Sequence, residues 1–410
     1  MRAREMVRRS VALALLLVVM GGAVEARAGG FSQGVQGGAS AGVAGALTAR
    51  PDVPEAGYYN PAGFVLGRGW AVELGAGAIF PTLFHVDPRT GERTRAENEL
   101  ALVPHLHARA RLGKRWGVGL SVGIPYASSL RWPAGWEGQA EAGALSLRAW
   151  EVAPSLAFRP TRWLALAAGP RLLRAGVGLE RAVDVAENPQ QAQMTLKAGA
   201  FGLGAQVGLW ANPWRSLNLG LSWRSAVRLN MEGPAELAHL SPELAAELGD
   251  TRASTSLGLP DRLVLGLAWE LSAQGIVSLD LEYQRWSSHE HFEVDFDDAR
   301  VADLSESRDW RDTITMRLGL EYGSPVNGLT LRSGFAIDPS PAPPGALSPA
   351  QPETDRYIAS LGLAYDVAER LRVNLAYNYV ILSQTSAGTE AYPGIYDGFS
   401  HVLVLSVRAK

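Results

Sequence analysis

The main feature of the chain is an alternation of apolar and polar residues with a period of two. Between Thr313 and Tyr322 every second residue is apolar, and the residues between them are polar, charged or Gly. Successive side chains of a β-strand point to opposite faces, so this segment predicts a strand with two chemically different faces. The pattern recurs at 217–228 and 371–379. We therefore expect an all-β fold.

A single strand of this kind fits a soluble sandwich as well as a membrane barrel, so the number of strands carries the argument. About fourteen segments have roughly the 9 to 11 residues that a tilted strand needs to cross a bilayer. Their approximate starts are Trp70, Glu99, Trp116, Gly143, Trp163, Ala192, Ser216, Thr255, Gly275, Arg311, Leu329, Glu353, Leu371 and Gly398.

The connections between these segments alternate between short and long. Tight turns fall near 113–115, 160–162, 212–213, 272–274 and 368–370, and longer loops near 81–98, 126–142, 231–254, 295–310, 339–352 and 384–397. Short periplasmic turns and long outer loops are typical of outer-membrane barrels. An open sheet edge in hydrocarbon would leave backbone groups unpaired, so the strands should close on themselves. Residues 70–410 thus predict a transmembrane antiparallel β-barrel of about 14 strands.

Tryptophans near the turns predict aromatic girdles at the two membrane interfaces. Trp116, Trp163 and Trp214 each fall at a short turn, which predicts a periplasmic girdle. Three others fall in or near the outer regions and are expected in the outer girdle: Trp132, Trp136 and Trp286.

The amino terminus has the features of a secretory signal peptide. Four arginines precede an apolar run from Val11 to Met20, and the small-residue site Ala26-Arg27-Ala28 follows. The run is shorter than the roughly 20 residues of a membrane-spanning helix, which disfavours a retained anchor. We expect residues 1–28 to be removed by cleavage after Ala28.

Residues 29–69 do not have the strand pattern. They are rich in Gly and Ala and contain Pro51, Pro54 and Pro61 as breakers. A disordered tail is one interpretation, but the segment also holds apolar residues such as Phe31 and Tyr59, which a solvated tail does not need. We expect a compact plug inside the barrel.

Composition narrows the possible partners. The 410 residues carry a formal net charge of -3 and contain no cysteine. There is no basic excess of the kind that binds nucleic acid, and disulfides and thiolate metal sites are excluded.

Several motifs resemble the FadL/TodX-type outer-membrane transporters along essentially the whole mature chain. Gly29-Gly30-Phe31 and Tyr59-Asn60-Pro61-Ala62-Gly63 resemble the amino-terminal hatch of that family, and Leu259-Pro260-Asp261-Arg262 and Trp310-Arg311-Asp312-Thr313 resemble later segments. The carboxyl end, Ser406-Val407-Arg408-Ala409-Lys410, departs from the aromatic ending that is common in such barrels.

This resemblance implies a passive channel for hydrophobic compounds in the outer membrane of a Gram-negative-type bacterium. The expected cargo is a long-chain fatty acid or an aromatic hydrocarbon, with the fatty acid favoured, released laterally into the membrane lipid. Neither enzymatic activity nor a cofactor or metal is implied, and a complete barrel can act as a monomer. The alternatives are a general porin or a structural surface β-barrel.

The resemblance and the local sequence together indicate candidate residues. Phe31 would contact the ligand pocket, and Asn60, Pro61 and Ala62 would form the hatch turn, although ordinary plug packing explains all four as well. Gly119, Gly123 and Pro125 favour a kink that serves as a lateral gate, or else make room for the plug.

Two further groups of candidates come from side-chain spacing. The segment 234–248 has helical spacing and could place four leucines on one face, as a capture groove or as a cover for the barrel mouth: Leu237, Leu240, Leu244 and Leu248. His105, His107 and Arg109 share one face of the second strand. They lack a third metal ligand or a nucleophile, so a polar lumenal stripe or a carboxylate contact is favoured over catalysis.

Overall fold

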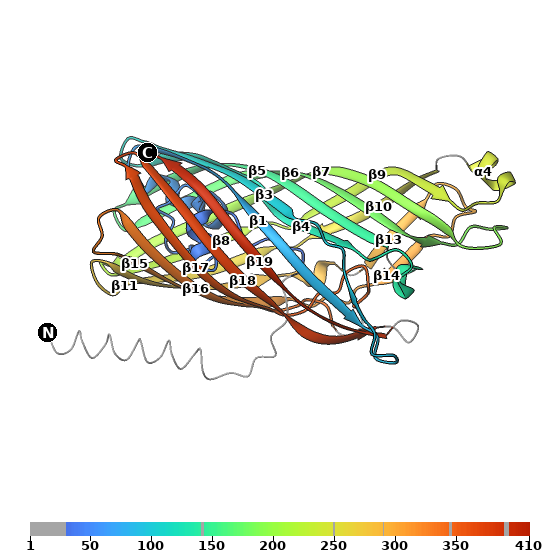
Figure 1. Ribbon diagram of the computed structural model, residues 1–410. Helices are drawn as coiled ribbons and strands as arrows, with labels where there is room; N and C mark the ends of the chain where they lie inside the picture. The colour runs from blue at the N-terminus through green and yellow to red at the C-terminus, as the bar shows by residue number, and fades with distance from the viewer. Residues whose placement is uncertain (1–29, 141–142, 249–250, 290, 344–346, 389–392) are drawn as a thin grey trace.

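The computed structural model describes residues 30–410, except 141–142, 249–250, 290, 344–346 and 389–392. The expected signal peptide, residues 1–28, lies outside the described residues. The neighbouring strands pair antiparallel, and the sheet closes because β1 (Trp70–Val86) pairs with both β3 (Ala101–Leu112) and β19 (Pro393–Ala409). Figure 1 shows the resulting elongated barrel, with the blue helical part of the amino-terminal segment inside it near the end that holds the carboxyl terminus.

The other strands complete the wall in chain order. They are β2 (Arg93–Arg95), β4 (Trp116–Arg131), β5 (Ala144–Thr161), β6 (Leu164–Val183), β7 (Ala192–Trp214), β8 (Leu217–Arg224), β9 (Val227–Ala238), β10 (Thr251–Leu259), β11 (Arg262–Glu270), β12 (Gly275–Gln284), β13 (His291–Phe296), β14 (Leu304–Ser307), β15 (Thr313–Gly323), β16 (Leu329–Asp338), β17 (Arg356–Ala368) and β18 (Leu371–Gly388).

Four of the spanning strands of the barrel are each divided into two segments. The pairs are β8 with β9, β10 with β11, β12 with β13, and β14 with β15, and the segments of each pair bond to neighbouring strands in register. β2 is a small outer extension paired with β1. When it is left out and each divided pair is counted as one, the barrel has fourteen spanning strands, which confirms the predicted strand number.

The alternation is confirmed, with the apolar face outside. Ile314 on β15 is 63% exposed, whereas its neighbour Thr315 is fully buried toward the lumen. A soluble sandwich would show the reverse. Leu203 and Leu361 are also exposed large apolar side chains on the outer surface, as lipid contact requires. None of the described helices is long and apolar enough to cross a membrane.

At the outer end the strands run further than the sequence predicted. β4 continues to Arg131, and β9 continues to Ala238 with Ala235 opposite Thr251. The predicted helix over 234–248 is therefore wrong in its first half, and only α4 (Pro242–Leu248) is helical. The leucine spacing fits a helix, but at 227–238 the strict alternation of buried and exposed residues shows that strand pairing dominates.

The girdle predictions have different outcomes at the two ends. Trp116, Trp163 and Trp214 are exposed at the short turns, as a periplasmic girdle requires. The outer girdle is wrong for Trp132, Trp136 and Trp286, which are all buried. Trp132 and Trp136 stack on each other at 4.2 Å between ring centroids, in a cluster that also contains Tyr396. These aromatic rings bury more surface inside the outer end than a lipid-facing position would allow.

The segment before the first strand packs against the inner face of the barrel. It contains α2 (Gly38–Gly42), α3 (Ala56–Tyr59) and η1 (Pro61–Val65), all of them buried. Glycines on the wall let its backbone approach closely: a Cβ at Gly220 would lie 2.2 Å from the Thr48 carbonyl oxygen. Polar wall residues also hold it, since Asp280 accepts a 2.9 Å hydrogen bond from the Thr48 N–H.

A charge on the outer surface should impair assembly in a depth-dependent way. Leu361 is 64% exposed in the middle of β17, and Val326 is 58% exposed in the turn 324–328. Leu361→Arg should destabilise the folded barrel by about 2–4 kcal/mol, and Val326→Arg by about 0–1 kcal/mol, because the cost falls toward the interface. Urea titration of barrels refolded in lipid vesicles measures both. Equal effects would contradict the assigned membrane depth.

Candidate functional site

Phe31 lies in an aromatic cage inside the barrel. Its ring centroid is 4.9 Å from Trp286, 5.9 Å from Trp310, and 6.1 Å from both Tyr126 and His289. The contacts with Tyr126, Trp286 and His289 are edge-to-face, an arrangement that stabilises an aromatic pair beyond its buried area. The Phe31 side chain is therefore packed in the barrel interior and is not part of a solvated tail.

Three of the four cage residues come from the interruptions of the wall, and the fourth, Tyr126, lies on β4. Trp286 and His289 lie between β12 and β13, and Trp310 lies between β14 and β15. Asp312 stabilises these breaks by accepting hydrogen bonds from the Ser287 N–H at 3.0 Å and from the Tyr283 hydroxyl at 2.5 Å. Since the chain leaves the ladder there, its side chains turn into the lumen.

Two cavities adjoin Phe31. The larger cavity, about 280 Å³, is lined by residues 30–35, by Ala101–Val103 of β3, by Ile124 and Ala127 of β4, and by residues 350–354. The smaller cavity, about 50 Å³, lies among the inner faces of β5, β6, β9 and β10. Phe31 lines both cavities, together with Ser128, Leu147, Ala350 and Gln351, so its ring lies where the two cavities adjoin.

The lining of the smaller cavity is mostly apolar, with one cluster of charge. Arg308 lies 3.2 Å from Glu306, and Arg181 lies 2.5 Å from the same carboxylate. These three side chains together carry one net positive charge. Burial and, to a lesser extent, the nearby Arg308 together lower the pKa of His289 to about 4, so this imidazole is neutral at pH 7. The cavity therefore combines an apolar wall with an incompletely neutralised arginine pair.

The wall beside the larger cavity is incompletely paired. β3 and β4 pair from Leu112 opposite Trp116 only as far as Leu106 opposite Val122. Beyond that point the described residues of β3 (101–105) and β4 (123–131) form no ladder with each other. On its other side, β4 shifts register against β5 between Gly123 and Tyr126. A bulge at Ile124 and Pro125 thus coincides with the stretch where β3 and β4 are no longer joined by ladder hydrogen bonds.

The amino-terminal segment occupies the edge that β3 leaves free. Gln33 N–H donates to the Pro125 carbonyl at 2.8 Å, and Ala127 N–H donates to the Phe31 carbonyl at 3.0 Å. Gly119 and Gly123 also make room for the segment, because a Cβ would lie 2.5 Å from the Phe64 ring or from the Gln36 amide oxygen. The structure thus has both features at these small residues: β4 is bulged next to Gly123, and Gly119 and Gly123 pack closely against the amino-terminal segment.

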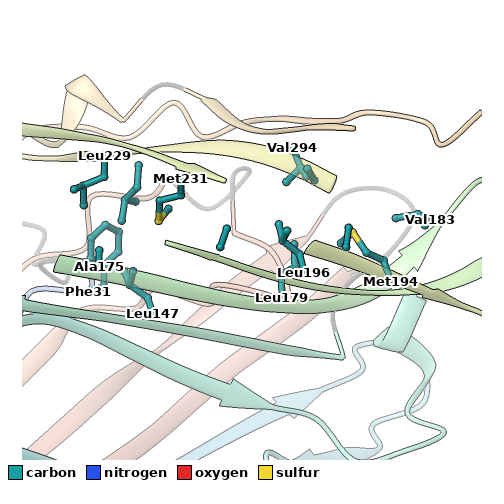
Figure 2. Packing of buried hydrophobic residues seen from close by; sticks show 14 of the residues in the cluster. Phe31, Leu147, Ala175, Leu179, Val183, Met194, Leu196, Leu229, Met231 and Val294 are labelled. Carbon is teal, nitrogen blue, oxygen red and sulfur yellow. The ribbon is translucent and has the colours of Figure 1, made fainter. Parts of the chain in front are cut away.

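An apolar lining extends from Phe31 toward the outer end. Figure 2 shows Phe31 and Leu147 at one end of this cluster, and Met194 and Val183 at the other. Leu244 and Leu248 of α4 are buried in the same cluster, with Leu237 and Leu240 packed against it. The four predicted leucines are thus brought together, but as packed side chains and outside both cavities.

The hatch turn lies away from the cavities. The Asn60 side-chain amide donates to the carbonyls of Thr48 at 2.9 Å and of Leu209 at 2.8 Å, and its oxygen accepts from Ala62 N–H at 3.1 Å. Pro61 follows as the first residue of η1. Asn60, Pro61 and Ala62 therefore connect the segment to the β7 backbone, and none of them lines either cavity.

The predicted polar stripe of β3 faces the segment and not the cavities. His107 shares a 2.6 Å hydrogen bond with the Gln36 carbonyl and a 2.8 Å hydrogen bond with the Ser121 hydroxyl. His105 stacks on His107, and the Arg109 guanidinium lies against Gly67. Within the described residues, no group of three or more His, Asp or Glu side chains is arranged to hold a metal ion.

The cage and the arginine pair are not evident from the sequence. One signal for Trp286 was present, because it is in phase with Asp280, Glu282 and Gln284, which all point into the lumen. His289, Arg308 and Trp310 lie in irregular connections where no periodicity indicates a direction.

Comparisons with known proteins agree with this geometry. The profile of the family described as "Outer membrane protein transport protein (OMPP1/FadL/TodX)" matches residues 19–408. A long-chain fatty acid transport protein of Escherichia coli O6:H1 is 22% identical over 325 residues, which cover 71% of this chain and 72% of that protein.

Two solved structures share the fold. A Pseudomonas aeruginosa FadL homologue has a TM-score of 0.82 at 20% identity, covering 93% of this chain and 99% of that chain. The P. putida toluene transporter TodX has a TM-score of 0.72 at 17% identity, covering 91% and 98%.

Asn60→Ala should loosen the amino-terminal segment within the barrel. It removes three hydrogen bonds, each contributing about 1 kcal/mol, and should raise ionic conductance in planar bilayers by opening the lumen. Asn188→Ala is a matched control, since Asn188 also makes three hydrogen bonds but lies in the loop after β6. Wild-type conductance in the Asn60 variant would show that this turn does not hold the segment.

Proposed function

Because this chain belongs to the outer membrane protein transport family (OMPP1/FadL/TodX), we propose that it is a passive channel for long-chain fatty acids that releases them sideways into the membrane. At the family level the chain is an outer-membrane transporter of hydrophobic compounds and not an enzyme. The predicted resemblance to FadL/TodX-type transporters is thereby confirmed. The cargo and the exit route are the proposal.

The observation that carries the choice of cargo is the net charge of the smaller cavity. A fatty acid has an apolar tail and one carboxylate, whereas an aromatic hydrocarbon has no charge. The wall of Leu147, Leu179 and Met231 suits a tail, and the shared pairing of Arg181 and Arg308 with Glu306 leaves one positive charge for a carboxylate. Charge-assisted hydrogen bonds of arginine to carboxylates are the strong ones.

Phe31 is the group that must move for a long tail to bind. The smaller cavity alone has room for only one or two water molecules, at about 30 Å³ each. Displacement of the Phe31 ring would join it to the larger cavity, which Phe31 also lines. Ligand entry is thus coupled to the position of Phe31 in the amino-terminal segment.

The same displacement would open the exit. The Phe31 carbonyl and the Gln33 N–H bond the free edge of β4 at the point where β3 has separated from it. A ligand that moves this segment also uncovers the opening, which is bordered by Leu102 and Ile124 of the larger cavity.

Lateral release follows from the chemistry of the cargo. Each CH₂ group gains about 0.8 kcal/mol on removal from water, so delivery of a long acyl chain into the aqueous periplasm would be strongly uphill. Passage through the wall into lipid avoids that cost, so no energy source is required. Gly119, Gly123 and Pro125 then act through the shape of β4 and not by contacting the ligand.

Substitution of Arg308 tests the assigned cargo. In Arg308→Met, Glu306 keeps Arg181 as a partner, so the change removes the free positive charge without leaving a buried carboxylate unpaired. Oleate affinity, measured by calorimetry on the purified barrel, should fall more than about tenfold, since a hydrogen bond to a charged group contributes about 1.5–3 kcal/mol. Toluene binding should not change.

Arg300→Met is the control for this substitution, because Arg300 pairs with Asp298 in the outer loop. Unchanged oleate affinity in Arg308→Met would remove the support for a fatty-acid cargo and leave the family-level function intact.

Deletion of Ile124 tests the exit. Between Gly123 and Tyr126, β4 has one residue more than β5, so a one-residue deletion should remove the bulge and extend the pairing with β3. Uptake of labelled oleate by cells should be lost, while binding to the purified barrel is retained. Ile124→Val, which keeps the register, should transport normally. Undiminished uptake after the deletion would refute lateral release at this site.

A further inference from the structure

One side of the periplasmic rim repeats a pair of residue types. Here the connections before β1, and between β3 and β4, β5 and β6, and β7 and β8, each place an exposed basic residue beside an exposed tryptophan. We call these basic residues the basic rim: Arg68, Lys114, Arg115, Arg162 and Arg215. The tryptophans are Trp70, Trp116, Trp163 and Trp214.

The four connections form one continuous band. Arg111 N–H donates to the Gly69 carbonyl at 2.9 Å, and Arg159 N–H donates to the Arg115 carbonyl at 2.7 Å. Asn212 N–H donates to the Trp163 carbonyl at 2.7 Å. Neighbouring connections are thus joined through the backbone, and the basic side chains lie on adjacent turns.

The charge of this band is unbalanced. Residues 66–69, 112–116, 159–163 and 212–216 contain no Asp or Glu. None of the ion pairs among the described residues includes a member of the basic rim. These five cations are therefore left to interact with something outside the chain.

The other connections of the rim, between β11 and β12, β15 and β16, and β17 and β18, have no exposed basic residue beside an exposed tryptophan. The connection between β11 and β12 follows the exposed Glu270, and the turn 324–328 is uncharged. The turn between β17 and β18 places Glu369 beside Arg370. Since all of these connections face the same aqueous compartment, solubility alone does not explain why exposed cations accompany the exposed tryptophans.

The tryptophans identify the height of the basic rim in the membrane. Exposed Trp rings of barrels lie at the level of the lipid headgroups, so the adjacent basic side chains are at the level of the phosphates. The guanidinium fork matches a phosphate group in a bidentate geometry. A soluble acidic protein would not account for a tryptophan at every one of these positions.

We propose that the basic rim binds the phosphate headgroups of anionic phospholipids in the periplasmic leaflet of the outer membrane. The site is separate from the cavities, and it does not depend on the identity of the cargo. It includes the turn that joins β3 and β4, so the bound lipids lie on the side of the barrel where β3 and β4 separate.

Native mass spectrometry of the full barrel, titrated with phosphatidylglycerol or phosphatidylcholine in detergent, tests this proposal. The wild type should bind phosphatidylglycerol more tightly, and raised salt should weaken that preference. The triple variant Arg115→Gln, Arg162→Gln, Arg215→Gln should lose about fivefold in phosphatidylglycerol affinity per arginine, the equivalent of about 1 kcal/mol each. Its phosphatidylcholine affinity should stay the same.

Arg370→Gln is the matched control, since it removes an exposed arginine from the turn between β17 and β18, which has no tryptophan and places Glu369 beside the arginine. Its phosphatidylglycerol affinity should equal that of the wild type. A loss as large as that of one basic-rim arginine would mean that net charge and not this site attracts the lipid, and would overturn the proposal.

Two competitors separate the lipid from other anions. Millimolar inorganic phosphate and soluble polyglutamate should leave the bound phosphatidylglycerol in place, because neither inserts beside the tryptophans. Displacement by phosphate would indicate a small-anion site, and displacement by polyglutamate would indicate an acidic protein partner. Either result, or equal binding of the two lipids by the wild type, would refute a lipid site.

Discussion

Every backbone polar group at membrane depth must find a partner within the protein, and the rest of this structure depends on how that demand is met where β3 and β4 separate. Each unpaired group in an apolar surrounding costs several kcal/mol. The barrel avoids this cost with residues outside the wall, because Phe31 and Gln33 bond the β4 backbone at Ala127 and Pro125. The separation of β3 from β4 is tolerated because a separate segment supplies hydrogen bonds to the β4 backbone there.

That solution connects the wall to the pocket. Phe31, whose carbonyl accepts the hydrogen bond from β4, also places its ring where the two cavities adjoin. The other end of the segment is held by Asn60, whose amide bonds the β7 backbone, and by glycines on the wall that allow close approach. In the proposed mechanism, the end of the segment at Phe31 moves while the end at Asn60 stays in place.

The wall was predictable from sequence because each residue of a barrel strand meets one of two very different environments. Ile314 and Thr315 illustrate this, and the same contrast gave fourteen strands with nearly correct starts. The outer end was less predictable. There the strands continue beyond the membrane, and Leu237 fits both a helical spacing and a strand.

The cage was not predictable, apart from the phase of Trp286. His289 and Trp310 contact Phe31, and Arg308 lines the cavity beside it, although all three are far from Phe31 in the sequence. They also lie between strands, where neither the strand period nor the helix period indicates which way a side chain points. Resemblance to known transporters directed attention to Phe31 and Asn60, but only the packing shows that Phe31 adjoins the cavities and Asn60 does not.

The interruptions of the wall have a consequence for how such a protein changes over evolutionary time. Trp286, His289, Arg308 and Trp310 contribute side chains to the pocket region from positions between strands, so replacing them alters few ladder hydrogen bonds. Cargo preference can therefore change by point substitution while the barrel continues to assemble. Proteins that descend from one barrel can come to transport different compounds without passing through a misfolded ancestor.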